Sequence, residues 1–151
     1  MRFETTRDML HHARDVHALI AKHFHELADK TDNPRVKMLL DYVEEHEKHL
    51  ENTLNRYEAD APTNILNAWF QFSPCERKMD QLKSLFTDKN VSTDEVIDQV
   101  LTLDECIMDM YRKIATEAEA EDVRDMFKNI LQMEENEQRK VVKNAMRLDI
   151  L

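Results

Sequence analysis

The chain has 151 residues, which suits one domain of common size and is long enough to bury a core. It contains no glycine and only three prolines, while Glu, Lys, Leu, Met and Ala are plentiful, as in proteins that are almost entirely helical. A net charge of -10 argues against nucleic acid or an anionic membrane as the main partner, because either would repel the protein.

The N-terminal sequence Met-Arg-Phe-Glu-Thr-Thr lacks the apolar core of a signal peptide. No run approaches the roughly 18 apolar residues of a membrane span. We therefore expect a cytoplasmic protein with no membrane partner. Cys75 and Cys106 are far apart and show no Cys-x-x-Cys spacing, so neither a zinc cluster nor a disulfide framework is expected.

The first half of the chain predicts a helical hairpin. Thr5, followed three residues later by Asp8, resembles a capping box, and an apolar series then runs at helical spacing to about Asp29. Pro34 is suited to the first position of a second helix, which continues to about Tyr57. The short connection between the two helices predicts that they are antiparallel.

The helical pattern breaks over residues 58–91, where Pro62 and Pro74 bracket an apolar piece that contains Trp69. We interpret this stretch as a crossover. A helix of 24 residues is about 36 Å long, and the connection to the second hairpin must run roughly that far. The aromatic residues of the crossover cover the bundle or form a subunit contact, and covering is the favoured use.

The second predicted hairpin covers residues 92–147. Ser92, with Glu95 three residues on, caps a third helix whose stripe ends near Ala118, and a fourth helix begins at about Glu121. The predicted fold is all-α: a single domain over residues 1–151 with hairpin 6–57, crossover 58–91 and hairpin 92–147. Strand content should be negligible.

Acidic and imidazole side chains interrupt the apolar stripes. On a helical wheel His46 and Glu47 fall inside the stripe of the second helix, and Glu134 and Glu137 fall inside that of the fourth. Asp104 lies within the third stripe. The residues of interest, with one histidine that flanks the first stripe, are His17, His46, Glu47, Asp104, Glu134 and Glu137.

The two hairpins align without a gap at an offset of 87 residues. This offset pairs Glu47 with Glu134, and His17 with Asp104, so the polar intrusions of the two halves lie at matching levels. Few of the aligned pairs are identities, and any two amphipathic helices align their stripes. The placement of the acids is therefore a stronger argument than the duplication.

Carboxylates at i and i+3 on the inner face of a bundle, with partners on neighbouring helices, are able to hold two iron or manganese ions. Glu47, Asp104, Glu134 and Glu137, with His17 or His46, make a candidate ligand set. The structural alternative is that these side chains lie at stripe edges and reach water or pair with a lysine. An unpaired buried carboxylate costs several kcal/mol or gains a proton, so for the group as a whole the metal interpretation stands beside the structural one.

Most of residues 6–147 resembles the ferritin-like superfamily, in its rubrerythrin-like branch. In that branch each hairpin supplies an acid about two turns before an aromatic, and then Glu-x-x-His on the next helix. Here Asp104 precedes Tyr111 by seven residues, and Glu134-Glu-Asn-Glu137 takes the paired-ligand position with an acid instead of His. The resemblance implies a metal-binding protein with an iron or manganese cofactor, acting as an oxidoreductase on oxygen or peroxide.

The first hairpin departs from the family pattern. His17 precedes Phe24 by seven residues but replaces the acid, and Leu50 stands where the His of Glu-x-x-His would be. A conventional two-metal centre is therefore in question. The alternative is a metal-free ferritin-like bundle with an association or regulatory role, in which the inward acids pair with His17 or His46.

A haemerythrin-like bundle ranks well below these interpretations, because that family needs His-x-x-x-Glu and His-x-x-x-His, and neither occurs in the sequence.

We also expect a homodimer. Leu10 and Ala21 on the first helix, together with the segment at residues 69–72, supply apolar groups that the four-helix core does not obviously use.

Overall fold

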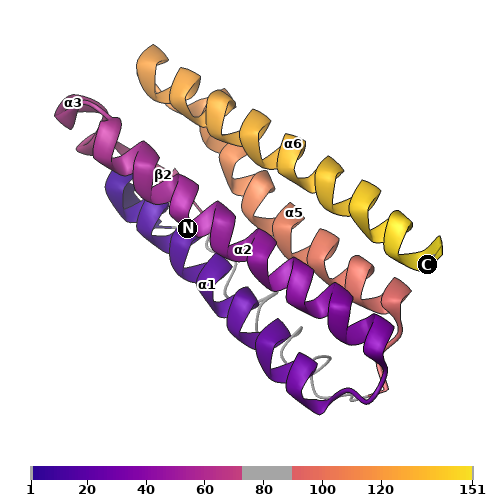
Figure 1. Cartoon of the computed structure of the whole chain (residues 1–151). Coiled ribbons are helices and arrows are strands. Elements are labelled where there is room, and N and C mark those ends of the chain that lie inside the picture. Colours follow the sequence, from indigo (N-terminus) through magenta and orange to yellow (C-terminus); the bar gives the residue numbers. More distant parts are fainter. Residues whose placement is uncertain (1, 73–89, 151) are drawn as a thin grey trace.

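The structure is a computed structural model that describes residues 2–72 and 90–150 (Figure 1). Within these ranges, long helices account for most of the chain, so the all-α prediction is confirmed. The elements in chain order are β1 (Arg2–Thr5), α1 (Thr6–Lys30), α2 (Pro34–Asp60), α3 (Thr63–Leu66), β2 (Trp69–Phe72), α5 (Thr93–Glu117) and α6 (Glu121–Ile150).

The long helices form two antiparallel hairpins, α1 with α2 and α5 with α6, which pack side by side (Figure 1). Asn64 of α3 donates a hydrogen bond to Asp122 at the start of α6, so α2 ends where α6 begins. Asn33, just before α2, and Val91, just before α5, line one surface pocket at the opposite end. The connection between the hairpins therefore has to cover the length of the bundle, as predicted.

Side-chain caps fix the helix starts at the predicted residues. The Thr5 hydroxyl accepts a hydrogen bond from the backbone N–H of Asp8, whose carboxylate in turn accepts one from the Thr5 N–H. Asn33 caps α2, and Ser92 caps α5 by accepting from the Glu95 N–H. α1 ends one residue beyond its predicted end, and α2 and α6 end three residues beyond theirs, whereas α5 ends at Glu117, one residue before Ala118.

The turn between α5 and α6 is made without glycine. Helix C-termini often use a glycine in the left-handed region to close their free carbonyls. Here the Arg124 guanidinium donates hydrogen bonds to the carbonyls of Ala118 and Glu119 instead. The part of the chain that the structure describes contains no residue with positive φ.

The core lies between the four long helices, and its largest fully buried side chains include Phe24, Tyr111 and Phe127. Phe70 of β2 adds to it by packing edge-on against Phe127, with ring centroids 5.7 Å apart. The predicted covering role of the crossover aromatics therefore applies to Phe70. Trp69, by contrast, is 69% exposed.

A short antiparallel ribbon pairs β1 with β2, with Glu4 opposite Phe70. These strands were not predicted from the sequence. Period-2 alternation is hard to recognise in segments of four residues, and the pairing joins the N-terminus to a segment more than sixty positions away. The ribbon holds Phe70 over one end of the bundle.

Two apolar residues on α1 are not available for self-association. Leu10 is 1% exposed and Ala21 is 4% exposed, so both are buried within the chain itself. The expectation that these two residues lie outside the four-helix core was wrong. A helical wheel assumes a single buried stripe, whereas neighbouring segments bury a wider arc of α1.

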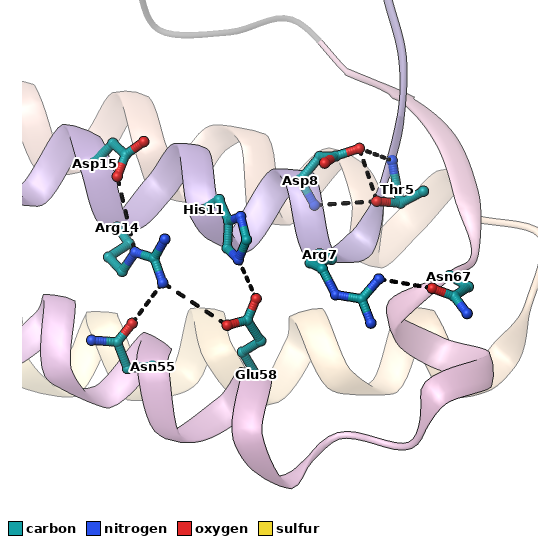
Figure 2. A network of polar contacts seen from close by, with 9 residues as sticks. All are labelled: Thr5, Arg7, Asp8, His11, Arg14, Asp15, Asn55, Glu58 and Asn67. Carbon is teal, nitrogen blue, oxygen red and sulfur yellow. Dashed lines mark hydrogen bonds and ion pairs between the residues drawn. The ribbon is translucent and has the colours of Figure 1, made fainter.

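The outer seam between α1 and α2 is held by polar side chains (Figure 2). His11 pairs with Glu58, and Arg14 reaches both Asn55 at 2.9 Å and Glu58 at 3.9 Å. Arg7 donates to Asn67, which follows α3. This seam is a surface counterpart to the buried imidazole and carboxylate groups described below.

In the described ranges, none of the helices is long and apolar enough to cross a membrane. Cys106 on α5 is disulfide-bonded, contrary to the expectation from the sequence. That expectation used the spacing of the cysteines along the chain, and this spacing does not show whether two cysteines lie close together in the fold. Cys75 lies outside the described residues.

Candidate metal centre

Each of the four long helices contributes one titratable side chain to a buried cluster near the middle of the bundle. They are His17 from α1, Glu47 from α2, Asp104 from α5 and Glu134 from α6, all at most 2% exposed. His46 of α2 joins them at 7%. We call these five residues the central cluster.

The central cluster forms because its members stand in the apolar stripes of their helices. Glu47 lies four residues after Val43 and three before Leu50, all buried on the inner face of α2. Glu134 lies four residues after Ile130 on the inner face of α6. Burial of the stripes therefore takes the polar side chains inside with them.

The imidazole of His17 lies between two carboxylates. Its Nδ1 is 2.5 Å from Oε2 of Glu47, and its Nε2 is 3.0 Å from Oε1 of Glu134. Two acceptors on the two ring nitrogens are satisfied together when both nitrogens carry hydrogen, as in the imidazolium. His17 thus links α1 with both α2 and α6.

Asp104 connects the two histidines of the cluster. Its Oδ2 accepts a hydrogen bond from Nε2 of His46 at 3.0 Å, and its Oδ1 is 3.8 Å from Nδ1 of His17. One ligand-type atom from each of His17, Glu47 and Asp104 lies within 4.8 Å of the others. Among the described residues, no other group of three such side chains converges in this way.

The pKa of His17 reflects its two neighbours. Burial by itself disfavours the charged imidazole, but the charges of Glu134 and Glu47 and their hydrogen bonds outweigh burial and hold the pKa of His17 well above its usual value. A proton is therefore retained on this ring at a pH where a solvent-exposed imidazole would have lost it.

The two carboxyls beside His17 behave differently. Burial, and then the charge of Asp104, raise the pKa of Glu47 well above its ordinary value, although His17 opposes them. Burial also disfavours the charged form of Asp104. The hydrogen bonds to this carboxylate, of which the one from His46 has the largest effect, nevertheless bring the pKa of Asp104 below its ordinary value. Asp104 is thus the anion of the pair, and Glu47 is the carboxyl that tends to keep a proton.

Several oxygens of the central cluster lack a hydrogen-bond partner. They are Oε1 of Glu47, Oδ1 of Asp104 and Oε2 of Glu134, all inaccessible to solvent. The buried hydroxyl of Tyr111 likewise lacks a hydrogen-bond partner. Burial, and then the charge of Glu134, raise the pKa of Tyr111 well above its usual value. Buried acceptors without a donor are uncommon, because each costs free energy unless a donor or a cation satisfies it.

Glu137 does not converge with the central cluster. Its side chain is 18% exposed, accepts a hydrogen bond from Lys140 at 3.2 Å and lies 3.6 Å from Nε2 of His49. At the corresponding position of α2, Leu50 is buried and offers no ligand atom. Of the six residues singled out from the sequence, the structure brings together five and leaves Glu137 at the edge.

Two polar features of the bundle were not predicted from the sequence. Glu44 is buried, and its carboxylate contacts His25 at 2.9 Å and Lys48 at 2.7 Å. Tyr111 was noted only as part of a spacing, yet its hydroxyl is among the buried groups next to the cluster. The seven-residue interval from Asp104 to Tyr111, two helical turns on one face, was the signal available for it.

Comparison with known proteins supports the architecture. No protein-family model matches the sequence, and no curated protein matches it. A crystal structure from Thermotoga maritima, provisionally described as a ferritin-like diiron-carboxylate protein, is similar in fold with a TM-score of 0.63. The match covers 97% of each chain at 13% sequence identity, so the likeness is one of fold. The chain therefore has a ferritin-like, all-α bundle fold.

Proposed function

We propose that the protein is a ferritin-like metal-binding protein that holds iron or manganese in the central cluster. The observation that carries this proposal is the set of three buried carboxylate oxygens without a donor, on Glu47, Asp104 and Glu134. A cation is the partner that such oxygens lack, and two of them belong to the residues that converge with His17.

The donor set favours these two metals. Carboxylate oxygens suit manganese, imidazole nitrogen suits iron, and a mixed set on the inner face of a helical bundle is typical of both. The central cluster contains no thiolate, which would favour zinc or copper(I). The ferritin-like diiron-carboxylate description of the structural neighbour agrees with a metal of this class.

Iron bound in this cluster would supply a ferrous and ferric couple, and we propose a small oxidant, oxygen or peroxide, as its reactant. The surrounding residues are suited to such chemistry. Tyr111 keeps a neutral hydroxyl near Glu134, and the apolar stripes exclude bulk water.

Metal content tests the proposal directly. The protein is produced in medium supplied with iron and manganese, and the metal per chain is measured before and after treatment with a chelator and reconstitution. We expect stoichiometric metal in the wild type and in Glu58→Gln, which alters a surface imidazole and carboxylate pair (Figure 2). Glu47→Gln should abolish binding. Metal far below one equivalent in the wild type, with no uptake on reconstitution, would refute the proposal.

One observation favours a second candidate, a metal-free bundle with an association or regulatory role. His17 bonds Glu47 and Glu134, and His46 bonds Asp104, so each carboxylate has an imidazole partner without any ion. The variant Asp104→Asn, at a residue that converges with His17 and Glu47, separates the two functions. A metal-free bundle loses only its ion pairs, whereas a metal-binding protein also loses the stabilisation that added metal gives the folded state.

A further inference from the structure

The two carboxylates that a pair of ions would share lie on opposite sides of one ring. Glu47 contacts Nδ1 of His17, and Glu134 contacts Nε2 of the same imidazole. The two nitrogens of an imidazole point away from each other, so the ring separates the carboxylates. All three side chains are buried, which leaves the ring little room to turn aside.

A two-ion centre requires a different arrangement. Its ions lie about 3.5–4 Å apart, and bridging carboxylates have to reach both of them. With His17 between Glu47 and Glu134, the two cannot bridge the same pair. The end of the site that would hold the second ion also lacks a ligand, because Leu50 is apolar and Glu137 is engaged by Lys140.

Charge balance leads to the same conclusion. The central cluster contains three carboxylates, on Glu47, Asp104 and Glu134. Two divalent ions would bring four positive charges into a buried space that offers at most three negative ones. A single divalent ion is balanced by two carboxylates, and the third remains to pair with an imidazole.

We infer that the central cluster holds one ion rather than two, bound by Nδ1 of His17 with the carboxylates of Glu47 and Asp104, while Glu134 and His46 position these ligands without binding the ion. This inference rests on the proposed function and adds to it the number of ions and the role of each residue. The three ligands are the group whose atoms lie within 4.8 Å of one another.

The outer contacts fit these roles. A metal-bound imidazole usually donates its other N–H to a carboxylate, which fixes the ring and strengthens the ligand. Nε2 of His17 faces Glu134 in that way, at 3.0 Å. A ligating carboxylate is likewise usually hydrogen-bonded, and His46 donates to Oδ2 of Asp104, whereas Oδ1 is the oxygen that lies 3.8 Å from Nδ1 of His17. Three protein ligands leave further coordination positions open to a small molecule.

Counting ions tests the inference with a readout other than activity. The chelated full-length protein is titrated with Mn(II), bound metal is measured by calorimetry and elemental analysis, and the loaded protein is examined by electron paramagnetic resonance. We expect one equivalent and the hyperfine spectrum of an isolated Mn(II) ion. Two equivalents, or the spectrum of an exchange-coupled pair, would overturn the inference and leave the proposed function intact. No binding at all would refute the proposed function itself.

Two matched substitutions test the division of roles. Asp104→Asn removes a ligand and should abolish Mn(II) binding, whereas Glu134→Gln should keep one equivalent and weaken the affinity about 10- to 100-fold, as expected for an outer contact. Glu58→Gln, which changes a surface pair of the same chemistry, should leave the affinity unchanged (Figure 2). Complete loss of binding in a folded Glu134→Gln protein, checked by circular dichroism, would make Glu134 a ligand and contradict the assignment.

Discussion

His17 on α1 and Glu134 on α6 are 117 residues apart in the chain, yet a hydrogen bond of 3.0 Å joins Nε2 of the imidazole to Oε1 of the carboxylate. Both side chains are buried, and the same imidazole also contacts Glu47 on α2. One ring therefore connects helices of both hairpins. The bundle depends on His17 for charge balance as well as for packing.

Replacing His17 should destabilise the metal-free protein strongly. His17→Leu keeps the volume similar but leaves Glu47 and Glu134 buried without their donor, and breaking a buried pair in this way costs about 3–5 kcal/mol of unfolding free energy. Urea denaturation in the presence of a chelator measures the change. His25→Leu, at a ring that is 61% exposed, serves as control and should cost less than about 1 kcal/mol. Equal effects would contradict a structural role for the buried imidazole.

Metal affinity should increase with pH. The pKa values of His17 and Glu47 are both raised, so each tends to carry a proton in the metal-free protein, and an ion has to displace these protons in order to bind. As the pH increases from about 6 to 8, fewer protons compete and Mn(II) should bind more tightly. Calorimetry in buffers with different ionisation enthalpies should detect the released protons. An affinity that does not change with pH would show that neither group is a ligand.

Restoring the family pattern on the first hairpin should raise the metal capacity. The double variant His17→Glu/Leu50→His removes the ring between Glu47 and Glu134, adds a carboxylate and supplies the missing imidazole. We expect two equivalents of Mn(II) per chain instead of one, measured by elemental analysis after gel filtration. Leu50→His alone keeps the separating ring and should stay at one equivalent. A double variant that also stays at one would mean that His17 does not limit the number of ions.

Glu44 should stabilise the fold near neutral pH and lose this contribution in acid. Burial opposes its charge, but hydrogen bonds from Lys48 and His25 bring the pKa of Glu44 below its ordinary value of 4.5. A carboxylate with a lowered pKa contributes stability above its unfolded pKa, and the contribution is lost as the pH falls through the folded value. Glu44→Gln should therefore cost about 1 kcal/mol at neutral pH, and the difference from wild type should shrink below pH 4.5. Glu45→Gln, at the exposed neighbouring position, is the control and should show no such pH dependence.

Self-association should depend on the exposed aromatics of the ribbon. Trp69 is 69% exposed and Phe3 is 65% exposed, and both line a groove beside the end of α5. We expect a dimer, with a mass near twice 18.0 kDa by sedimentation equilibrium at tens of micromolar protein. Phe3→Ala/Trp69→Ala should shift the mass to that of the monomer. Met38→Ala, at a similarly exposed apolar residue on α2, should leave the dimer unchanged. A wild-type mass of 18.0 kDa would contradict the expectation.

The helices were predictable because their signals are local. A cap such as Thr5 with Asp8 and a stripe of apolar residues involve positions within a few turns of each other, and both follow from backbone geometry alone. The ribbon was not predictable, because β1 and β2 are stabilised by pairing between distant segments. Leu10 was misjudged for a related reason, since the arc of α1 that is covered depends on its neighbours.

The central cluster was predictable as a group but not in its pairings. A wheel places Glu47, Asp104 and Glu134 on inner faces, yet it does not give the axial register between helices, which decides that His17 meets Glu134. The wheel also placed Glu137 too far inside the buried face. A residue three positions from Glu134 is rotated by about 60° around the helix axis and therefore lies at the edge of that face. Its partners there, Lys140 and His49, are therefore surface residues.

All four long helices contribute to the central cluster, and the three proposed ligands come from α1, α2 and α5, so neither hairpin contains the complete set of ligands. An ion held there could leave only when α1 and α2 part from α5 and α6, and its exchange with isotopically labelled metal in solution should be no faster than the opening of the bundle. The residence time of the metal would then report the lifetime of the closed fold. A hairpin produced as a separate fragment would release the ion at once.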